Sequence, residues 1–176
     1  MRVSIEPYAD APAAYHEYDA DAPVVARLVA DAITAVKPGL AVEHVGSTAV
    51  PGCAGKGVID LMILYPAGQL AEAKEALDQL GFQRQTTRDP FPEDRPMRVG
   101  VVAHSGKRFR IHAHVIAANS AEASELRAFR DRLRAESDFR SAYQACKKAI
   151  LAAGVTDSVA YAEAKGQFIS QAKATS

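Results

Sequence analysis

Cysteine is scarce and tryptophan is absent from this sequence of 176 residues. The two cysteines, Cys53 and Cys146, are too few for the disulfide scaffold of a small secreted protein, so we expect two thiols in a reducing compartment. No apolar segment of the kind found in secretion signals follows Met1. Both observations predict a cytoplasmic protein.

Neither an excess of one charge nor a long apolar run is present. The 21 Lys and Arg residues balance the 21 Asp and Glu residues, which disfavours a protein that binds long nucleic acids or membrane surfaces over a broad face. The most apolar run, residues 58–65, contains Asp60 and is far shorter than the roughly 18 residues of a membrane-spanning helix. The balance is uneven, because residues 1–88 carry 7 basic and 11 acidic side chains and residues 89–176 carry 14 and 10.

The length predicts one domain, residues 1–176, and the hydrophobic pattern predicts an α+β fold. We expect strands over residues 3–5, 41–45, 58–65, 82–87, 98–103 and 108–117, and helices over residues 11–36, 71–80 and, divided near Ser137 and Asp157, from 121 to the end. The sheet then lies within residues 1–118, and a helical region, residues 119–176, packs on it. Residues 58–65 are apolar on both faces, which is typical of a central strand covered on both sides.

Asp60 is the first candidate functional residue, because it interrupts this apolar strand. A buried carboxylate without a partner would cost several kcal/mol or become protonated. A metal ion, a cationic partner or a position at the open end of the strand would justify it. The structural alternative is a carboxylate that accepts hydrogen bonds from backbone N–H groups of a nearby loop.

The loop of residues 46–52 is the second candidate. Small residues such as Gly46 let the backbone approach a ligand, the hydroxyls of Ser47 and Thr48 can bind a phosphate, and Lys56 can supply a positive charge. The loop matches neither the Walker A pattern nor the Rossmann glycine spacing, and an ordinary connection after a strand is an equally good interpretation.

Alternation in residues 108–115 gives the third candidate. The apolar residues occupy every second position and face a core, so Arg110, His112 and His114 share the opposite face. Such a patch suits an anionic ligand, although a solvated sheet face is the simpler alternative. The His-x-His pair can also bind a transition metal together with His44 or Asp60. An arginine-rich stretch, residues 127–134, predicts a helix with a salt-bridged surface.

The segment Glu-His-Val-Gly-Ser-Thr-Ala-Val-Pro-Gly at residues 43–52, followed by Lys56 and Ile59-Asp60, resembles the GrpB-like family of bacterial proteins. Members of this family are largely uncharacterised, and the same domain is found fused to dephospho-CoA kinase in some bacteria. The resemblance extends over almost the whole chain, through matches at residues 6–8, 110–115, 128–134 and 161–169.

The family looks like a branch of the nucleotidyltransferase superfamily, which implies a mixed β-sheet flanked by helices. In that superfamily a Gly-Ser pair opens a short helix and binds nucleotide phosphates, and a following strand carries two acidic residues that hold divalent metal. Gly46, Ser47 and Asp60 match this spacing. Met62 replaces the second acid, and the later strand offers His112 and His114 in place of a third, which is a poor donor set for two Mg²⁺ ions.

Three functions are consistent with these residues. The first is a protein that binds a nucleotide or phosphorylated metabolite and transfers a nucleotidyl group, with Mg²⁺ on Asp60. In that hypothesis Gly46, Ser47, Thr48, Lys56 and Arg110 bind phosphate, and Asp60, His112 and His114 are catalytic. The second is a non-catalytic nucleotide-binding module, linked by the fused relatives to coenzyme A metabolism. The third is a hydrolase with a transition metal held by the histidines.

Overall fold

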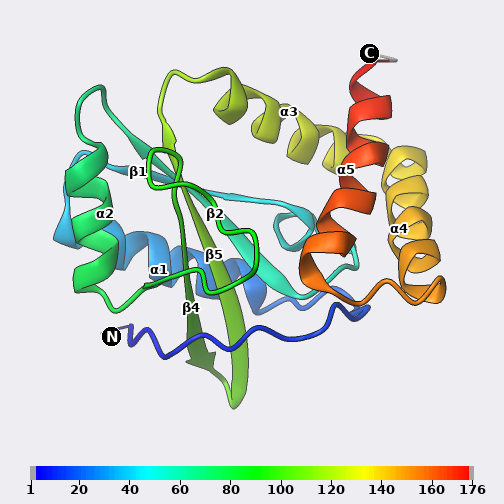
Figure 1. The fold of residues 1–176 in the computed structure, drawn as a ribbon, viewed down its shortest axis with the longest axis horizontal. Helices are drawn as coiled ribbons and strands as arrows, with labels where there is room; N and C mark the ends of the chain where they lie inside the picture. Colours follow the sequence, from blue (N-terminus) through cyan, green and yellow to red (C-terminus); the bar gives the residue numbers. More distant parts are fainter. Residues whose placement is uncertain (1–2, 175–176) are drawn as a thin grey trace.

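A mixed sheet of five strands with helices on both faces organises residues 3–174, the part of the chain that this computed structural model describes (Figure 1). The strand order is β1-β2-β5-β4-β3; only the β2–β5 pair is parallel. The elements, in chain order, are α1 (Ala22–Val36), β1 (Ala41–Val45), the 3₁₀ helix η1 (Ser47–Ala49), β2 (Val58–Tyr65), α2 (Leu70–Gln79), β3 (Gln83–Arg84), β4 (Met97–His104), β5 (Lys107–Ala117), α3 (Ala121–Ala135), α4 (Ser137–Ala152) and α5 (Ser158–Ala174).

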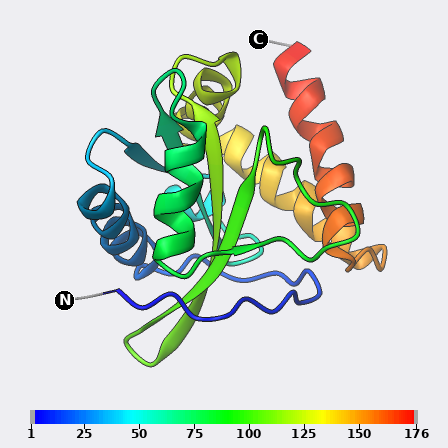
Figure 2. The same ribbon diagram turned by 60° about the vertical axis from the view of Figure 1, so that its left-hand side comes forward.

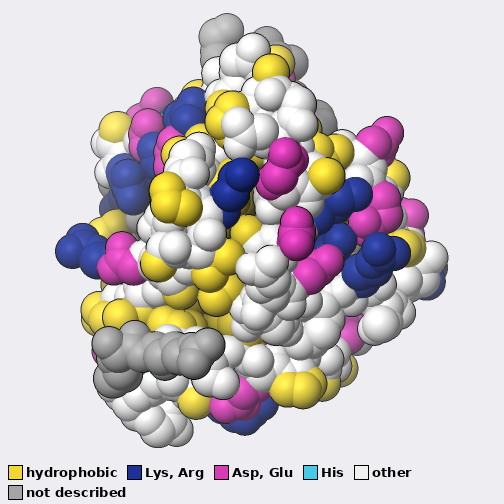
Figure 3. Space-filling view, turned by 90° about the vertical axis from the view of Figure 1, so that its left-hand side faces the viewer, with side chains coloured by type: hydrophobic (Ala, Val, Ile, Leu, Met, Phe, Trp, Pro, Cys, Tyr) yellow, Lys and Arg dark blue, Asp and Glu magenta, His cyan; other side chains and the backbone are white. Residues whose placement is uncertain are grey.

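Helices α1 and α2 cover one face of the sheet. Val25, Val29 and Ile33 recur at helical spacing in α1 and pack with Ile59 and Leu61 of β2 in the main hydrophobic core. On the side of the molecule that Figure 3 shows, basic and acidic side chains are intermixed and form no broad field of one sign.

The opposite face of the sheet is covered only in part. Helix α3 covers one end of this face, where its Ala123 packs with Met62 and Leu64 of β2. A separate core made by α3, α4 and α5 contains Leu133 and Tyr143. Figure 2 shows α4 and α5 standing apart from the sheet, with the β3–β4 loop running toward α5. The residues of this face that α3 leaves uncovered lie in β2, β4 and β5.

The N-terminal third departs from the sequence prediction. Residues 11–21 form no helix; instead the backbone of His16 pairs with Gly55 in both directions, with N···O distances of 2.7 and 2.9 Å. Residues 3–5 form no strand, and the backbone meets the sheet in a single bridge between Glu6 and Val101. These pairings satisfy backbone groups that a helix would have satisfied within itself.

The second half agrees more closely with the prediction. Strands β4 and β5 form the expected hairpin, with Ser105 and Gly106 at φ values of 50° and 76°. Asp157 caps α5 by accepting a hydrogen bond from the Ala160 N–H. Ser137 is the first helical residue of α4, and Glu136 holds the capping position. None of the helices within residues 3–174 has the length and apolar character needed to cross a membrane.

Candidate functional site

A cleft of about 450 Å³ lies between the uncovered part of the sheet and helices α4 and α5. The sheet contributes polar side chains from β2 and β5, and the helices contribute lysines and tyrosines. The residues that line the cleft include Tyr8, Asp10, Ser47, Lys56, Asp60, Thr87, Asp89, Phe91, His112, His114, Tyr143, Lys147, Tyr161, Glu163 and Lys165.

Asp60, His112 and His114 meet at the centre of the sheet wall. Asp60 is opposite His112 in the parallel β2–β5 ladder, and His114 follows two residues later on the same face. The Oδ1 atom of Asp60 lies 3.4 Å from Nε2 of His114 and 3.7 Å from Nδ1 of His112. Within the described part of the chain, this is the only group of three or more acidic, His or Cys side chains whose ligand atoms come together.

The electrostatics of this group favour an ionised carboxylate beside neutral imidazole. Burial raises the pKa of Asp60, but the hydrogen bond from His114 and the neighbouring positive charges outweigh it and hold the pKa well below its usual range. Burial lowers the pKa of His112 to about 4, against the opposing attraction of Asp60. Nε2 of His112 lies 2.9 Å from the hydroxyl of Tyr8. At pH 7 His112 is therefore uncharged, with Nδ1 3.7 Å from Oδ1 of Asp60.

Gly46 leaves room for the Asp60 side chain and is not among the residues that line the cleft. A Cβ built on Gly46 would lie 2.7 Å from Oδ2 of Asp60. The neighbouring Ser47 opens the short helix η1, as the resemblance implied, and its side chain reaches the cleft.

Two further candidates hydrogen-bond to backbone carbonyls beside the cleft. The Thr48 hydroxyl donates a hydrogen bond to the Val58 carbonyl and lies 2.9 Å from Nε2 of His44. Arg110 donates through Nη2 to the carbonyl of Lys56 at 3.3 Å. The cleft lining therefore contains five of the predicted site residues: Ser47, Lys56, Asp60, His112 and His114. The other three, Gly46, Thr48 and Arg110, lie next to lining residues and are not part of the lining.

His44 is not the third member of the histidine cluster. It pairs with Leu61 in the β1–β2 ladder and so lies on the face opposite Asp60. Burial lowers its pKa to about 4. Of the two partners that the sequence left open for His112 and His114, the structure selects Asp60.

Sequence reasoning missed Lys147, a fully buried lysine on α4 with a side chain in the cleft lining. Its ammonium donates to the Ala54 carbonyl and lies 4.2 Å from the centre of the Tyr143 ring. Burial lowers its pKa to about 8. A signal existed in the sequence: Lys147 follows Phe139 and Tyr143 at four-residue steps, which places it on the buried face of its helix.

The opposite rim is formed by the β3–β4 loop, which contributes Thr87 and Phe91. Arg88 of this loop pairs with Asp157, just before α5, at 2.9 Å. The Phe91 ring lies edge-on to the His114 ring with a centroid distance of 5.6 Å. The Thr87 hydroxyl is buried and has no hydrogen-bond partner within residues 3–174.

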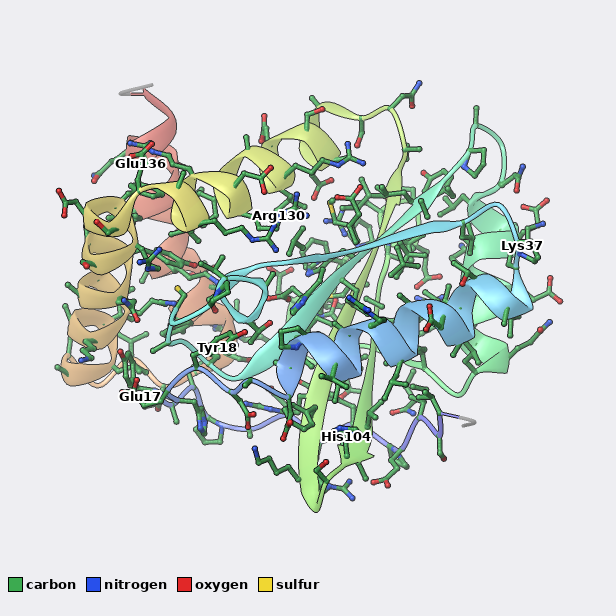
Figure 4. All side chains as sticks on the ribbon, turned by 180° about the vertical axis from the view of Figure 1, so that it is seen from behind. Glu17, Tyr18, Lys37, His104, Arg130 and Glu136 are labelled. Atoms are coloured by element: carbon green, nitrogen blue, oxygen red, sulfur yellow. The ribbon has the colours of Figure 1, made fainter. Side chains whose placement is uncertain are left out.

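The arginine-rich helix α3 does not contribute to the cleft. Arg127 and Arg130 bind the carboxylate of Glu43 on β1, and Arg134 donates to the Ala49 carbonyl. Figure 4 shows Arg130 directed from α3 toward β1. These contacts confirm the prediction of a salt-bridged helix surface.

The comparison with known families is decisive for identity. Residues 12–175 match the family described as "GrpB protein". The chain belongs to the GrpB family. A UPF0157 protein of Pseudomonas aeruginosa is 35% identical over 135 residues, and one of Streptomyces coelicolor is 32% identical over 128 residues. The match covers 76% and 73% of this GrpB chain and 54% and 64% of those relatives, so the chain spans between half and two thirds of their length.

Solved structures agree with this assignment. GrpB from Enterococcus faecalis superposes with a TM-score of 0.63 at 20% identity, covering 90% of this chain and 98% of that one. A chain of the GLD-2/RNP-8 complex superposes with a TM-score of 0.52 at 14% identity, covering 75% and 54%. The fold of this GrpB chain is therefore nucleotidyltransferase-like, as the sequence predicted.

The Mg²⁺ ions that such a fold implies do not fit the residues present. Mg²⁺ prefers an octahedral shell of hard oxygen atoms. The cluster provides the carboxylate of Asp60 and two imidazoles, while Met62 occupies the place of a second acid and is fully buried. No step that depends on Mg²⁺ follows from this geometry.

Proposed function

We propose that the cleft binds a nucleotide or another phosphorylated small molecule. The observation that carries the proposal is the convergence of Lys56, Lys147 and Lys165 on the cavity that also contains Ser47. Burial lowers the pKa of Lys56 and of Lys147, and the charge of Lys165 lowers both further, against the opposing attraction of Asp60. Like charges in a partly dry cavity repel one another, and a ligand with several negative charges offsets that repulsion.

The remaining lining favours a nucleotide over a bare phosphate. Asp10, Asp89 and Glu163 present carboxylates that can accept hydrogen bonds from sugar hydroxyls or a base amino group. A volume of about 450 Å³ lies within the range of sites that enclose small molecules.

Replacing Lys147 with methionine tests this proposal. Methionine keeps an unbranched side chain of similar length and removes only the ammonium, so we expect at least a tenfold loss of affinity for ADP or inorganic triphosphate, since charge-assisted hydrogen bonds contribute about 1.5–3 kcal/mol each. Lys148→Met is the matched control, because Lys148 is the next residue, exposed, and stacked over Tyr15 outside the cleft. Calorimetry measures both; equal affinities in the two variants would contradict the proposal.

The Mg²⁺ dependence of binding distinguishes a nucleotidyltransferase from a non-catalytic nucleotide-binding module. The same titrations are run with and without Mg²⁺. Binding that requires Mg²⁺ supports nucleotidyl transfer. Binding that is independent of Mg²⁺ supports the non-catalytic module, which the missing second carboxylate at Met62 favours.

Ligand affinity is expected to fall as the pH rises from 7 to 9. The pKa of Lys147 is about 8, so this lysine is mostly charged at pH 7 and mostly neutral at pH 9. Burial raises the pKa of the neighbouring Cys53 and Tyr143, which favours their uncharged forms. We expect a decrease of about five- to tenfold across the two pH units, measured by calorimetry with ADP. Lys147→Met should show a shallower profile, and an affinity that rises with pH would contradict the assignment.

A further inference from the structure

We infer that Asp60, His112 and His114 form a mononuclear site for a zinc-like transition metal ion in the floor of the cleft. This inference adds a metal to the proposed function, but metal binding can be measured without any phosphate ligand. Two imidazoles and one carboxylate are a donor set that zinc uses in catalytic sites, where a water or substrate fills the remaining position. The same nitrogen-rich set is unsuited to Mg²⁺.

The distances between the ligand atoms fit such an ion. With metal–ligand bonds near 2.1 Å, two ligand atoms of a tetrahedral site lie about 3.4 Å apart. The observed separations from Oδ1 of Asp60 are 3.4 Å to Nε2 of His114 and 3.7 Å to Nδ1 of His112. All three atoms lie within 4.8 Å of one another, so a small contraction brings them into coordination.

The surroundings hold two of the three ligands in the required orientation. A metal on Nδ1 of His112 leaves the Nε2–H to donate to the Tyr8 hydroxyl, which lies 2.9 Å away. The lack of a Cβ on Gly46 leaves room for the Asp60 carboxylate at this place, since a Cβ would lie 2.7 Å from Oδ2. Both histidines project from a strand that is paired along its length with β2 and β4, which makes the backbone positions rigid.

His114 has a neighbour that opposes metal binding. Its Nδ1 faces the guanidinium of Arg95 at 3.5 Å, and a metal on Nε2 would leave an N–H on Nδ1 facing a group that cannot accept a hydrogen bond. Arg95 is paired with Glu122, which reduces the net charge presented to the site. Replacing Arg95 with methionine should therefore tighten metal binding by about threefold or more.

Equilibrium dialysis of untagged protein with Zn²⁺, Co²⁺ or Mg²⁺ alone tests the site. We expect one Zn²⁺ or Co²⁺ per chain and no Mg²⁺ at the same concentrations. His114→Gln and Asp60→Asn should each weaken Zn²⁺ binding by about tenfold to 100-fold or more. His104→Gln is the matched control, because His104 lies at the far end of the β4–β5 hairpin (Figure 4) and should leave the affinity unchanged. Circular dichroism confirms that each variant is folded.

The cobalt spectrum identifies the ligands independently of the variants. Coordination by His and Asp gives visible d–d bands without the near-ultraviolet charge-transfer band of a thiolate, which would point instead to Cys53 or Cys146. The inference is overturned by a thiolate band, by Mg²⁺ binding as tightly as Zn²⁺, or by equal affinities in His114→Gln and His104→Gln. Zn²⁺ is titrated in the absence of phosphate ligands and ADP in the absence of Zn²⁺, so failure of the phosphate proposal and failure of the metal site are distinguishable.

Discussion

Replacing Gly46 with alanine is expected to lower the free energy of unfolding by about 3 kcal/mol and to displace Asp60. Gly46 has φ 73° and ψ −173°, a conformation that is essentially restricted to glycine. The new Cβ would also lie 2.7 Å from Oδ2 of Asp60, well inside van der Waals contact. Asp60 cannot retreat freely, because its other oxygen is hydrogen-bonded to His114.

Gly52→Ala is the control for this prediction. Gly52 has a φ of 76°, close to that of Gly46, but its Cβ would meet nothing within 4 Å. It therefore reports the cost of a side chain at positive φ without a steric contact, which we expect to be about 1 kcal/mol. Urea unfolding followed by circular dichroism measures both variants, and equal losses would show that the contact with Asp60 contributes nothing. Zn²⁺ affinity should fall in Gly46→Ala and not in Gly52→Ala.

The sheet wall of the cleft could be predicted from sequence because strand periodicity is local information. Alternation in residues 108–115 placed His112 and His114 on one face, and the structure confirms that Ile111 and Ala113 are buried on the other. The apolar run around Asp60 indicated a strand covered on both sides, which holds for residues 61–64 of β2 but not at Asp60, where the cleft opens. Only the ladder register, which is long-range information, places Asp60 opposite His112.

The helical wall could not be predicted in the same way. Lys147 and Lys165 enter the cleft because α4 and α5 pack against α3 in a separate core, and helical periodicity does not say which partner a buried face will meet. Thr48 and Arg110 illustrate the reverse case. Their types suit phosphate binding, but the Thr48 hydroxyl donates to the carbonyl of Val58, and Nη2 of Arg110 donates to the carbonyl of Lys56.

Replacing Arg98 with methionine is expected to lower the free energy of unfolding by about 2–3 kcal/mol. Arg98 is 1% exposed and lies on β4, where its guanidinium donates to Asp78 of α2 at 2.9 Å and to both oxygens of Glu93 at 2.9 and 3.1 Å. Burial lowers the pKa of Arg98, but its two carboxylate partners more than compensate and raise it. Asp78 and Glu93 are 49% and 42% exposed, so water can solvate them in the variant and the loss stays moderate.

Glu93 belongs to the same loop as Thr87 and Phe91 of the cleft rim, so its ion pair with Arg98 links that loop to β4. Arg98→Lys keeps the charge and loses the two-pronged contact, so we expect an intermediate loss of about 1–2 kcal/mol. Arg84→Met is the control: Arg84 is 70% exposed and lies 3.7 Å from the same Glu93 carboxylate, and its loss should cost less than about 0.5 kcal/mol. Urea unfolding measures the stability of the three variants, and we expect the largest loss in Arg98→Met and the smallest in Arg84→Met. ADP affinity should decrease in the same order, although neither arginine lines the cleft. A variant series in which Arg84→Met matches Arg98→Met would show that the buried guanidinium does not fix the loop.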